Sequence, residues 1–212
     1  MQAAMGDLKT MSLVLSSLLF LATADAELPS LDLVPPDEAE RRLAACGLVD
    51  VEARYDDQVR DHVLHVEDSA PPDESLACAA DVSSVTGYWI EVPENSRDAY
   101  FAHYRRISRQ RSQEWARERL TQQGLLAAAP IYVPGETDDK EFADRLESLC
   151  GDAAKGALQS EFGPHAISPA WAQSRDGKLD ETAEVMMCLM TYAAAAGYEM
   201  HFIGNGKAAE PD

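Results

Sequence analysis

The alternation of apolar and polar residues changes in the same way at two places along the chain. In each place an apolar run with helical spacing contains a cysteine and ends at a glycine, with eight residues between the two (Cys78 and Gly87, Cys188 and Gly197). A tyrosine follows each glycine, and polar and apolar residues alternate beyond it. This change of period across a glycine is typical of a helix that ends in a left-handed cap and is followed by a strand.

Further landmarks upstream of both corners indicate that a folding unit is repeated. Cys46-Gly47 and Cys150-Gly151 each close a predicted helix. Between the landmarks, alternating residues predict strands. These strands cover residues 49–55, 59–66 and 88–92 in the first half, and residues 157–162, 165–168 and 198–203 in the second. The sequence therefore predicts an α+β fold of two tandem αββαβ-like units that are related by internal duplication.

A long helix over residues 97–123 is predicted to join the two units. Its stretch from 108 to 114 is polar on every side, which is typical of a bridging or solvated helix. The helix carries seven arginines, at positions 97, 105, 106, 109, 111, 117 and 119. They either lie against the acidic surfaces of the chain's own units or form a basic binding arm, for which Arg105 and Arg109 are the candidate contacts.

The first 26 residues have the pattern of a signal peptide. An apolar run over 11–22 precedes Ala24-Asp25-Ala26, which places small residues where a signal peptidase reads them. The alternative is a buried or amphipathic N-terminal helix. The predicted organisation is a signal peptide at 1–26, a first unit at 27–95, a connecting helix and extended linker at 96–134, a second unit at 135–206 and a tail at 207–212.

Four cysteines fit export to an oxidising compartment, either the periplasm or the exterior of the cell. Four cysteines allow three pairings, and the repeat favours Cys46 with Cys78 and Cys150 with Cys188. The alternative is that the cysteines are small buried hydrophobic residues. No Cys-x-x-Cys occurs, so neither a zinc site nor a redox dithiol is predicted.

The chain is strongly acidic, with a formal net charge of −19. This charge disfavours nucleic acid and anionic membrane surfaces as partners, and it would steer a cationic partner toward the protein. The mature chain is not expected to insert into a membrane, because the apolar run at 11–22 is short and belongs to the predicted leader.

Familiar catalytic motifs are absent from the sequence. It contains no Gly-x-Ser-x-Gly, His-Glu-x-x-His or Ser-x-x-Lys, and no metal or cofactor site is predicted. The candidate catalytic group is a general base formed by His201 with His165 and Glu199, should the fold bring them together.

Two further positions are candidate binding residues. Trp89 is out of phase with Tyr88 and Ile90, so it faces away from their side of the strand. It is either covered by another layer or marks a ligand or partner surface. Asn205 lies between two glycines, which form either a strand-ending turn or a set of backbone N–H groups for an anion.

These observations favour an exported, non-catalytic binding or interaction protein whose ligand is an unknown protein or small molecule. A cationic protein is one such partner. The alternative hypothesis is a secreted or periplasmic hydrolase with its site between the two units.

Overall fold

The computed structural model describes residues 32–200. The predicted signal peptide, the tail at 207–212, and the candidate residues His201 and Asn205 lie outside this range. Within it the chain forms six α-helices and one three-stranded sheet, which confirms the α+β class. The predicted domain boundaries stay predictions.

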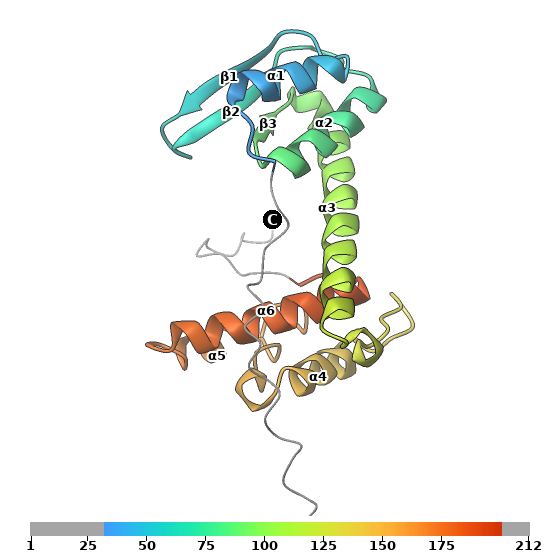
Figure 1. The fold of residues 1–212 in the computed structure, drawn as a ribbon, viewed down its shortest axis with the longest axis vertical. Coiled ribbons are helices and arrows are strands. Elements are labelled where there is room, and N and C mark those ends of the chain that lie inside the picture. The colour runs from blue at the N-terminus through green and yellow to red at the C-terminus, as the bar shows by residue number, and fades with distance from the viewer. Residues whose placement is uncertain (1–31, 201–212) are drawn as a thin grey trace, which may run out of the picture. The chain divides into compact units, whose positions relative to one another are not determined.

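The sheet lies in the first half of the chain. Strands β1 (Val51–Asp56) and β2 (Asp61–Val66) form an antiparallel hairpin, and β3 (Trp89–Glu91) pairs with β2 in parallel. Helix α1 (Pro36–Ala45) packs on the hairpin, and α2 (Asp73–Thr86) packs next to β3 (Figure 1). A first hydrophobic core forms between these helices and one face of the sheet.

The free edge of β1 is partly capped by a side chain. Glu40 on α1 accepts a hydrogen bond from the backbone N–H of Ala53, with 2.6 Å between Oε1 and N. Because β1 is an edge strand, this N–H is one of the groups that has no strand partner on the outer side.

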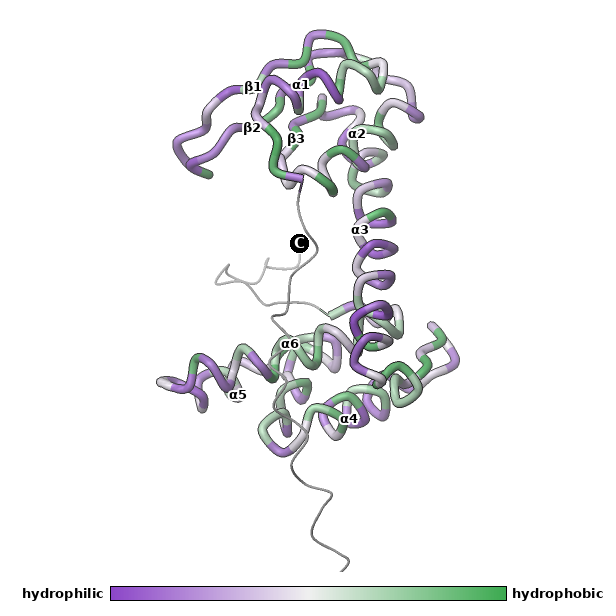
Figure 2. The backbone as a smooth tube through the Cα atoms, viewed as in Figure 1, coloured by the Kyte–Doolittle hydropathy of each residue, from purple (hydrophilic) through white to green (hydrophobic). Residues whose placement is uncertain are grey.

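Helix α3 (Glu94–Gln122) contributes to two cores. It starts directly after Pro93, whose fixed φ suits the residue before a helix. Near its start Tyr100 is buried in the first core, and near its end Ala116 and Leu120 are buried in a second one. Hydrophilic residues predominate along the middle of the helix (Figure 2).

The second core is helical. It is formed mainly by α4 (Asp139–Leu149) and α6 (Leu179–Ala196), with the short helix α5 (Pro169–Gln173) and two 3-10 helices, η1 (Leu126–Ala128) and η2 (Asp152–Ala154). Its fully buried leucines come from α3, α4, α6 and the loop after η2: Leu120, Leu146, Leu189 and Leu158.

The strands predicted over 157–162 and 165–168 are wrong. These residues form turns with a single bridge between Ser160 and Gly163. The buried carboxylate of Glu147 accepts the backbone N–H groups of Gly156 and Leu158, at 2.9 and 2.7 Å, and so replaces a strand partner. Residues 198–200 are not in a strand either, and the rest of the predicted closing strand lies outside the described residues. The described part of the second half therefore lacks the αββαβ order.

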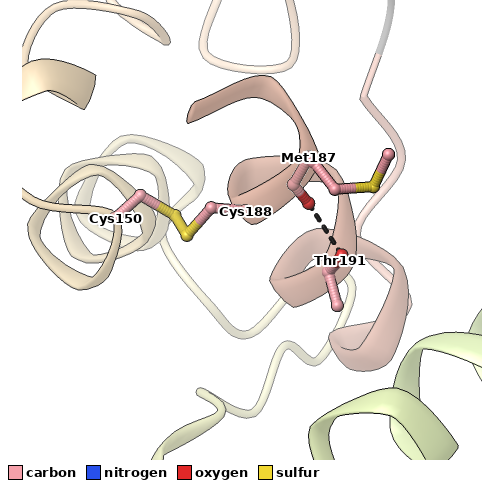
Figure 3. The surroundings of a disulfide bond; sticks show 4 residues. All are labelled: Cys150, Met187, Cys188 and Thr191. Carbon is pink, nitrogen blue, oxygen red and sulfur yellow. Dashed lines mark hydrogen bonds between the residues drawn. A yellow bond between two sulfur atoms is a disulfide. The ribbon is translucent and has the colours of Figure 1, made fainter. Parts of the chain in front are cut away.

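Both disulfides have the pairing that the repeat favoured. Cys46 pairs with Cys78, and Cys150 pairs with Cys188, with Cα–Cα distances of 5.6 and 5.8 Å. Figure 3 shows the second bridge, which ties the end of α4 to the middle of α6. Each bridge thus links the end of one helix to a later helix in the same half of the chain.

The two glycine–tyrosine corners also share their local structure. Gly87 and Gly197 end α2 and α6 with φ of 78° and 76°, which confirms the predicted left-handed caps. The hydroxyl groups of Tyr88 and Tyr198 each donate to a backbone carbonyl at 2.9 Å. The acceptors are Val34 and Pro164. The features common to both halves are therefore the helices, the bridge and this corner.

Candidate functional site

The first candidate site lies on the side of the sheet that faces away from α1 and α2. The strand register places Arg54, Val63 and Trp89 in one row on this side. Val63 is buried between its two neighbours, whereas Trp89 is 60% exposed. A large apolar ring left in solvent at the edge of a small sheet is typical of a contact surface.

Helix α3 extends this surface. The ring of Phe101 packs against Trp89, with 6.0 Å between the ring centroids. Phe101 also contacts the buried Tyr100, whose ring is stacked on that of Tyr104. The first turns of α3 therefore hold Trp89 from one side and leave its other side open.

Two recesses lie near β3 and the start of α3, and Trp89 and Phe101 line the smaller one. The smaller has a volume of about 50 Å³, and five of its eight lining residues are aromatic: Tyr88, Trp89, Tyr100, Phe101 and Tyr104. The larger has a volume of about 250 Å³, and six of its nine lining residues are polar: Arg54, His65, Glu67, Glu91, Glu94 and Arg97. Pockets for small molecules usually measure roughly 300–1,000 Å³, so these recesses suit single side chains better.

The charges in the larger recess are mostly paired with one another. Arg54 contacts both Glu52 and Glu67 at 2.7 Å, and His65 Nδ1 lies 2.9 Å from Glu91 Oε2. The hydrogen bond from Arg54 lowers the pKa of Glu52. Three carboxylates of this face are therefore already paired within the chain, whereas Glu94 in the same recess forms no ion pair with a described residue.

The arginines of α3 divide into two groups. Five of them contact other groups of the chain: Arg106 with His103, Arg109 with Glu199, Arg111 with Asp81, Arg117 with the carbonyl of Ala195, and Arg119 with the ring of Trp115. The other two, Arg97 and Arg105, are exposed and form no hydrogen bond or ion pair with any residue in the described range 32–200. We call Trp89, Arg97, Phe101, Tyr104 and Arg105 the β3–α3 surface.

Similarity to known proteins does not assign a role to this surface. Comparison with protein-family models, with curated proteins and with solved structures found no match.

The second candidate site surrounds His165. Its Nε2 lies 3.2 Å from Asp139 Oδ2, and its Nδ1 lies 2.8 Å from the backbone carbonyl of Glu199. The ring of Tyr198 is stacked on the imidazole, with 4.4 Å between centroids. The fold thus brings His165 next to Glu199 through the main chain of Glu199, whereas His201, the centre of the predicted general base, lies outside the described residues. The side chain of Glu199 pairs with Arg109 instead.

The phenol groups beside His165 are not activated as nucleophiles. Tyr132 donates to Asp139 at 2.7 Å, and this hydrogen bond raises the pKa of Tyr132 and lowers that of Asp139. Burial raises the pKa of Tyr198, whose hydroxyl is used to bind the carbonyl of Pro164. The cluster joins the start of α4 to the segment after α6, which is a structural role.

Lowering the pH tests whether the hydrogen bonds of Asp139 stabilise the fold. Hydrogen bonds from Tyr132 and from His165 hold the folded-state pKa of Asp139 below its unfolded value of about 3.9. Asp139 therefore stabilises the fold above pH 4, and this contribution is lost as the pH falls through the lower, folded-state pKa. We expect the free energy of unfolding to fall less between pH 7 and pH 3 in Asp139→Asn than in the parent chain.

The matched control for this measurement is Asp57→Asn. Asp57 is exposed, and its side chain forms no hydrogen bond or ion pair with the described part of the chain. Its pH profile of stability, measured by urea unfolding, should run parallel to that of the parent chain. A profile of Asp139→Asn that also runs parallel would show that the hydrogen bonds of Asp139 are not stabilising.

Two other classes of site were sought among residues 32–200. No group of three or more histidine, cysteine, aspartate or glutamate side chains is placed to hold a metal ion in this range. No helix in the same range has the length and apolar character needed to cross a membrane.

The sequence pointed to part of the β3–α3 surface. Trp89 and Arg105 were identified as candidate binding residues, whereas Arg109 is engaged with Glu199. The contribution of Arg97 and Phe101 was missed. Their spacing could have indicated their position, because Arg97, Phe101 and Arg105 are each four residues apart and so lie along one side of a helix.

Proposed function

We propose that the chain is an exported, non-catalytic protein-binding module whose contact surface is the β3–α3 surface. The observation that carries this proposal is the position of Trp89, which is 60% exposed, held by Phe101 and part of the lining of a small aromatic recess. Tryptophan, tyrosine and arginine are the residues most enriched among those that dominate the energy of protein interfaces. All three types occur in this surface.

Export is part of the proposal. Both pairs of cysteines are bridged, and disulfides persist mainly in oxidising compartments. The apolar run and small residues of the first 26 positions support the same interpretation. The protein would act in the periplasm or outside the cell.

The alternative of a hydrolase receives less support. Both ring nitrogens of His165 face hydrogen-bond acceptors, and the neighbouring phenols have raised pKa values. Neither recess contains a residue of that cluster. The net charge of −19 attracts basic proteins at long range, so the hypothesis of a partner with a positive overall charge is kept.

Site-specific photo-crosslinking tests the proposal. A photoreactive benzoylphenylalanine at position 89 of the full-length chain, expressed in its own cells, is expected to form one dominant adduct with another protein. The same group at position 55 is the control, because Tyr55 is 58% exposed on the same sheet but lies outside the β3–α3 surface. Equal crosslinking at both positions, or none at position 89, would contradict the proposal.

A stability measurement separates binding from folding. Trp89 is mostly exposed, so Trp89→Ala is expected to change the free energy of unfolding by less than about 1 kcal/mol. Loss of partner binding in this variant would then report on the contact and not on the fold.

A further inference from the structure

We propose that the partner presents an apolar side chain between two carboxylates, which bind Arg97 and Arg105 on either side of Phe101. This inference rests on the proposed function, because it names the chemistry of the partner at the β3–α3 surface. It assigns the local contact to an acidic segment, although the chain as a whole is acidic.

The geometry of α3 sets the spacing. Arg97, Phe101 and Arg105 follow one another at intervals of four residues, so they lie along one side of the helix. Eight residues at 1.5 Å each separate the two arginines by about 12 Å along the helix axis. Phe101 lies midway between them and supports the exposed ring of Trp89.

Charge complementarity decides which partner fits. The nearby carboxylates of Glu52, Glu67 and Glu91 are already paired with Arg54 or His65. Within residues 32–200, Arg97 and Arg105 have no such partner, and neither Glu94 nor Asp98 forms an ion pair with them. Guanidinium groups that would be covered on binding need a carboxylate opposite, since an uncompensated buried charge is strongly unfavourable.

The long-range repulsion between an acidic chain and an acidic segment is limited. At physiological ionic strength, charges on the surface are largely screened beyond about 8 Å. Carboxylates farther away than this contribute little, so the two direct arginine contacts are opposed mainly by the nearby Glu94 and Asp98. A short acidic segment of a larger protein meets this requirement without the whole partner being acidic.

The smaller recess accounts for the apolar side chain. Its volume of about 50 Å³ is lined mainly by aromatic rings, and Trp89 and Phe101 form one of its walls. One aliphatic or aromatic side chain can bury its tip there, next to the ring that the partner covers. The apolar contact would supply affinity, and the two arginines would fix the register.

Charge reversal in the crosslinking experiment tests the inference. With the photoreactive group at position 89, Arg97→Glu and Arg105→Glu combined are expected to lower the yield of the adduct about ten-fold. The lysine double variant, Arg97→Lys with Arg105→Lys, should retain most of the yield. The adducted peptide, identified by mass spectrometry, should contain an apolar residue between acidic ones.

A matched control removes the effect of net charge. Arg60→Glu combined with Arg145→Glu makes the same change in charge at two exposed arginines whose side chains form no hydrogen bond or ion pair with the described residues. This variant should crosslink like the parent chain. Equal loss in both reversal variants, or no loss in either, would overturn the inference while leaving the binding module in place. Absence of any adduct at position 89 would overturn both.

Discussion

Replacing Glu147 with alanine is expected to lower the free energy of unfolding by about 2–4 kcal/mol. This side chain is only 4% exposed, and its carboxylate accepts hydrogen bonds from the N–H groups of Gly156 and Leu158. Alanine would leave one buried and one partly buried N–H without an acceptor, and each such loss is unfavourable by roughly 1–3 kcal/mol. The shift of the urea midpoint, with the slope of the transition unchanged, measures the effect.

Two further variants test whether the buried hydrogen bonds of Glu147 cause this loss of stability. Asp144→Ala removes an exposed carboxylate from the same helix, where it pairs with Lys140, and should change stability by no more than about 0.5 kcal/mol. Glu147→Gln keeps one carbonyl oxygen and is expected to fall between the parent chain and alanine. Similar losses for Asp144→Ala and Glu147→Ala would show that the buried hydrogen bonds are not the cause.

Removal of either disulfide is expected to have a comparable or larger effect. The bridges close segments with sequence separations of 32 and 38 residues. On the chain-entropy model, each restricts the unfolded chain by an amount worth about 4 kcal/mol. Cys46→Ala with Cys78→Ala, and separately Cys150→Ala with Cys188→Ala, should each lower the free energy of unfolding by that amount, measured by urea unfolding under oxidising conditions.

The parent chain under reducing conditions is the control for these variants. Reduction should destabilise it at least as much as either double substitution alone. It should leave the variant that lacks both bridges unchanged. A loss of less than about 1 kcal/mol in either double variant would mean that the cysteines act mainly as small buried side chains, the alternative that the sequence left open.

The helix caps and the cysteine pairing were predicted correctly because both depend on local sequence signals. The change of hydrophobic period at Gly87 and Gly197 correctly located the two left-handed caps, because glycine is the residue that such a cap needs. A second local signal is the aspartate at the start of α4, where Asp138 accepts the N–H of Glu141. The order of the cysteines around these helices then indicated the pairing.

Long-range contacts explain what the sequence could not predict. Alternation over 157–162 resembled a strand, but the structure satisfies Gly156 and Leu158 with a carboxylate from α4, nine and eleven residues away. Nothing in the local pattern distinguishes a segment bound to a side chain from one bound to a strand. The β3–α3 surface could not be predicted from the local pattern either, because Trp89 contacts Phe101 only once β3 and α3 have packed together.

The contact between Glu40 and Ala53 has a consequence for the protein at high concentration. An exposed strand edge is a template on which another molecule can add a strand, and this is a common start of aggregation. In this chain a carboxylate from α1 occupies one of the N–H groups along the edge of β1. The contact therefore places a negative charge and a competing acceptor where an incoming strand would have to pair, which disfavours strand addition at this edge.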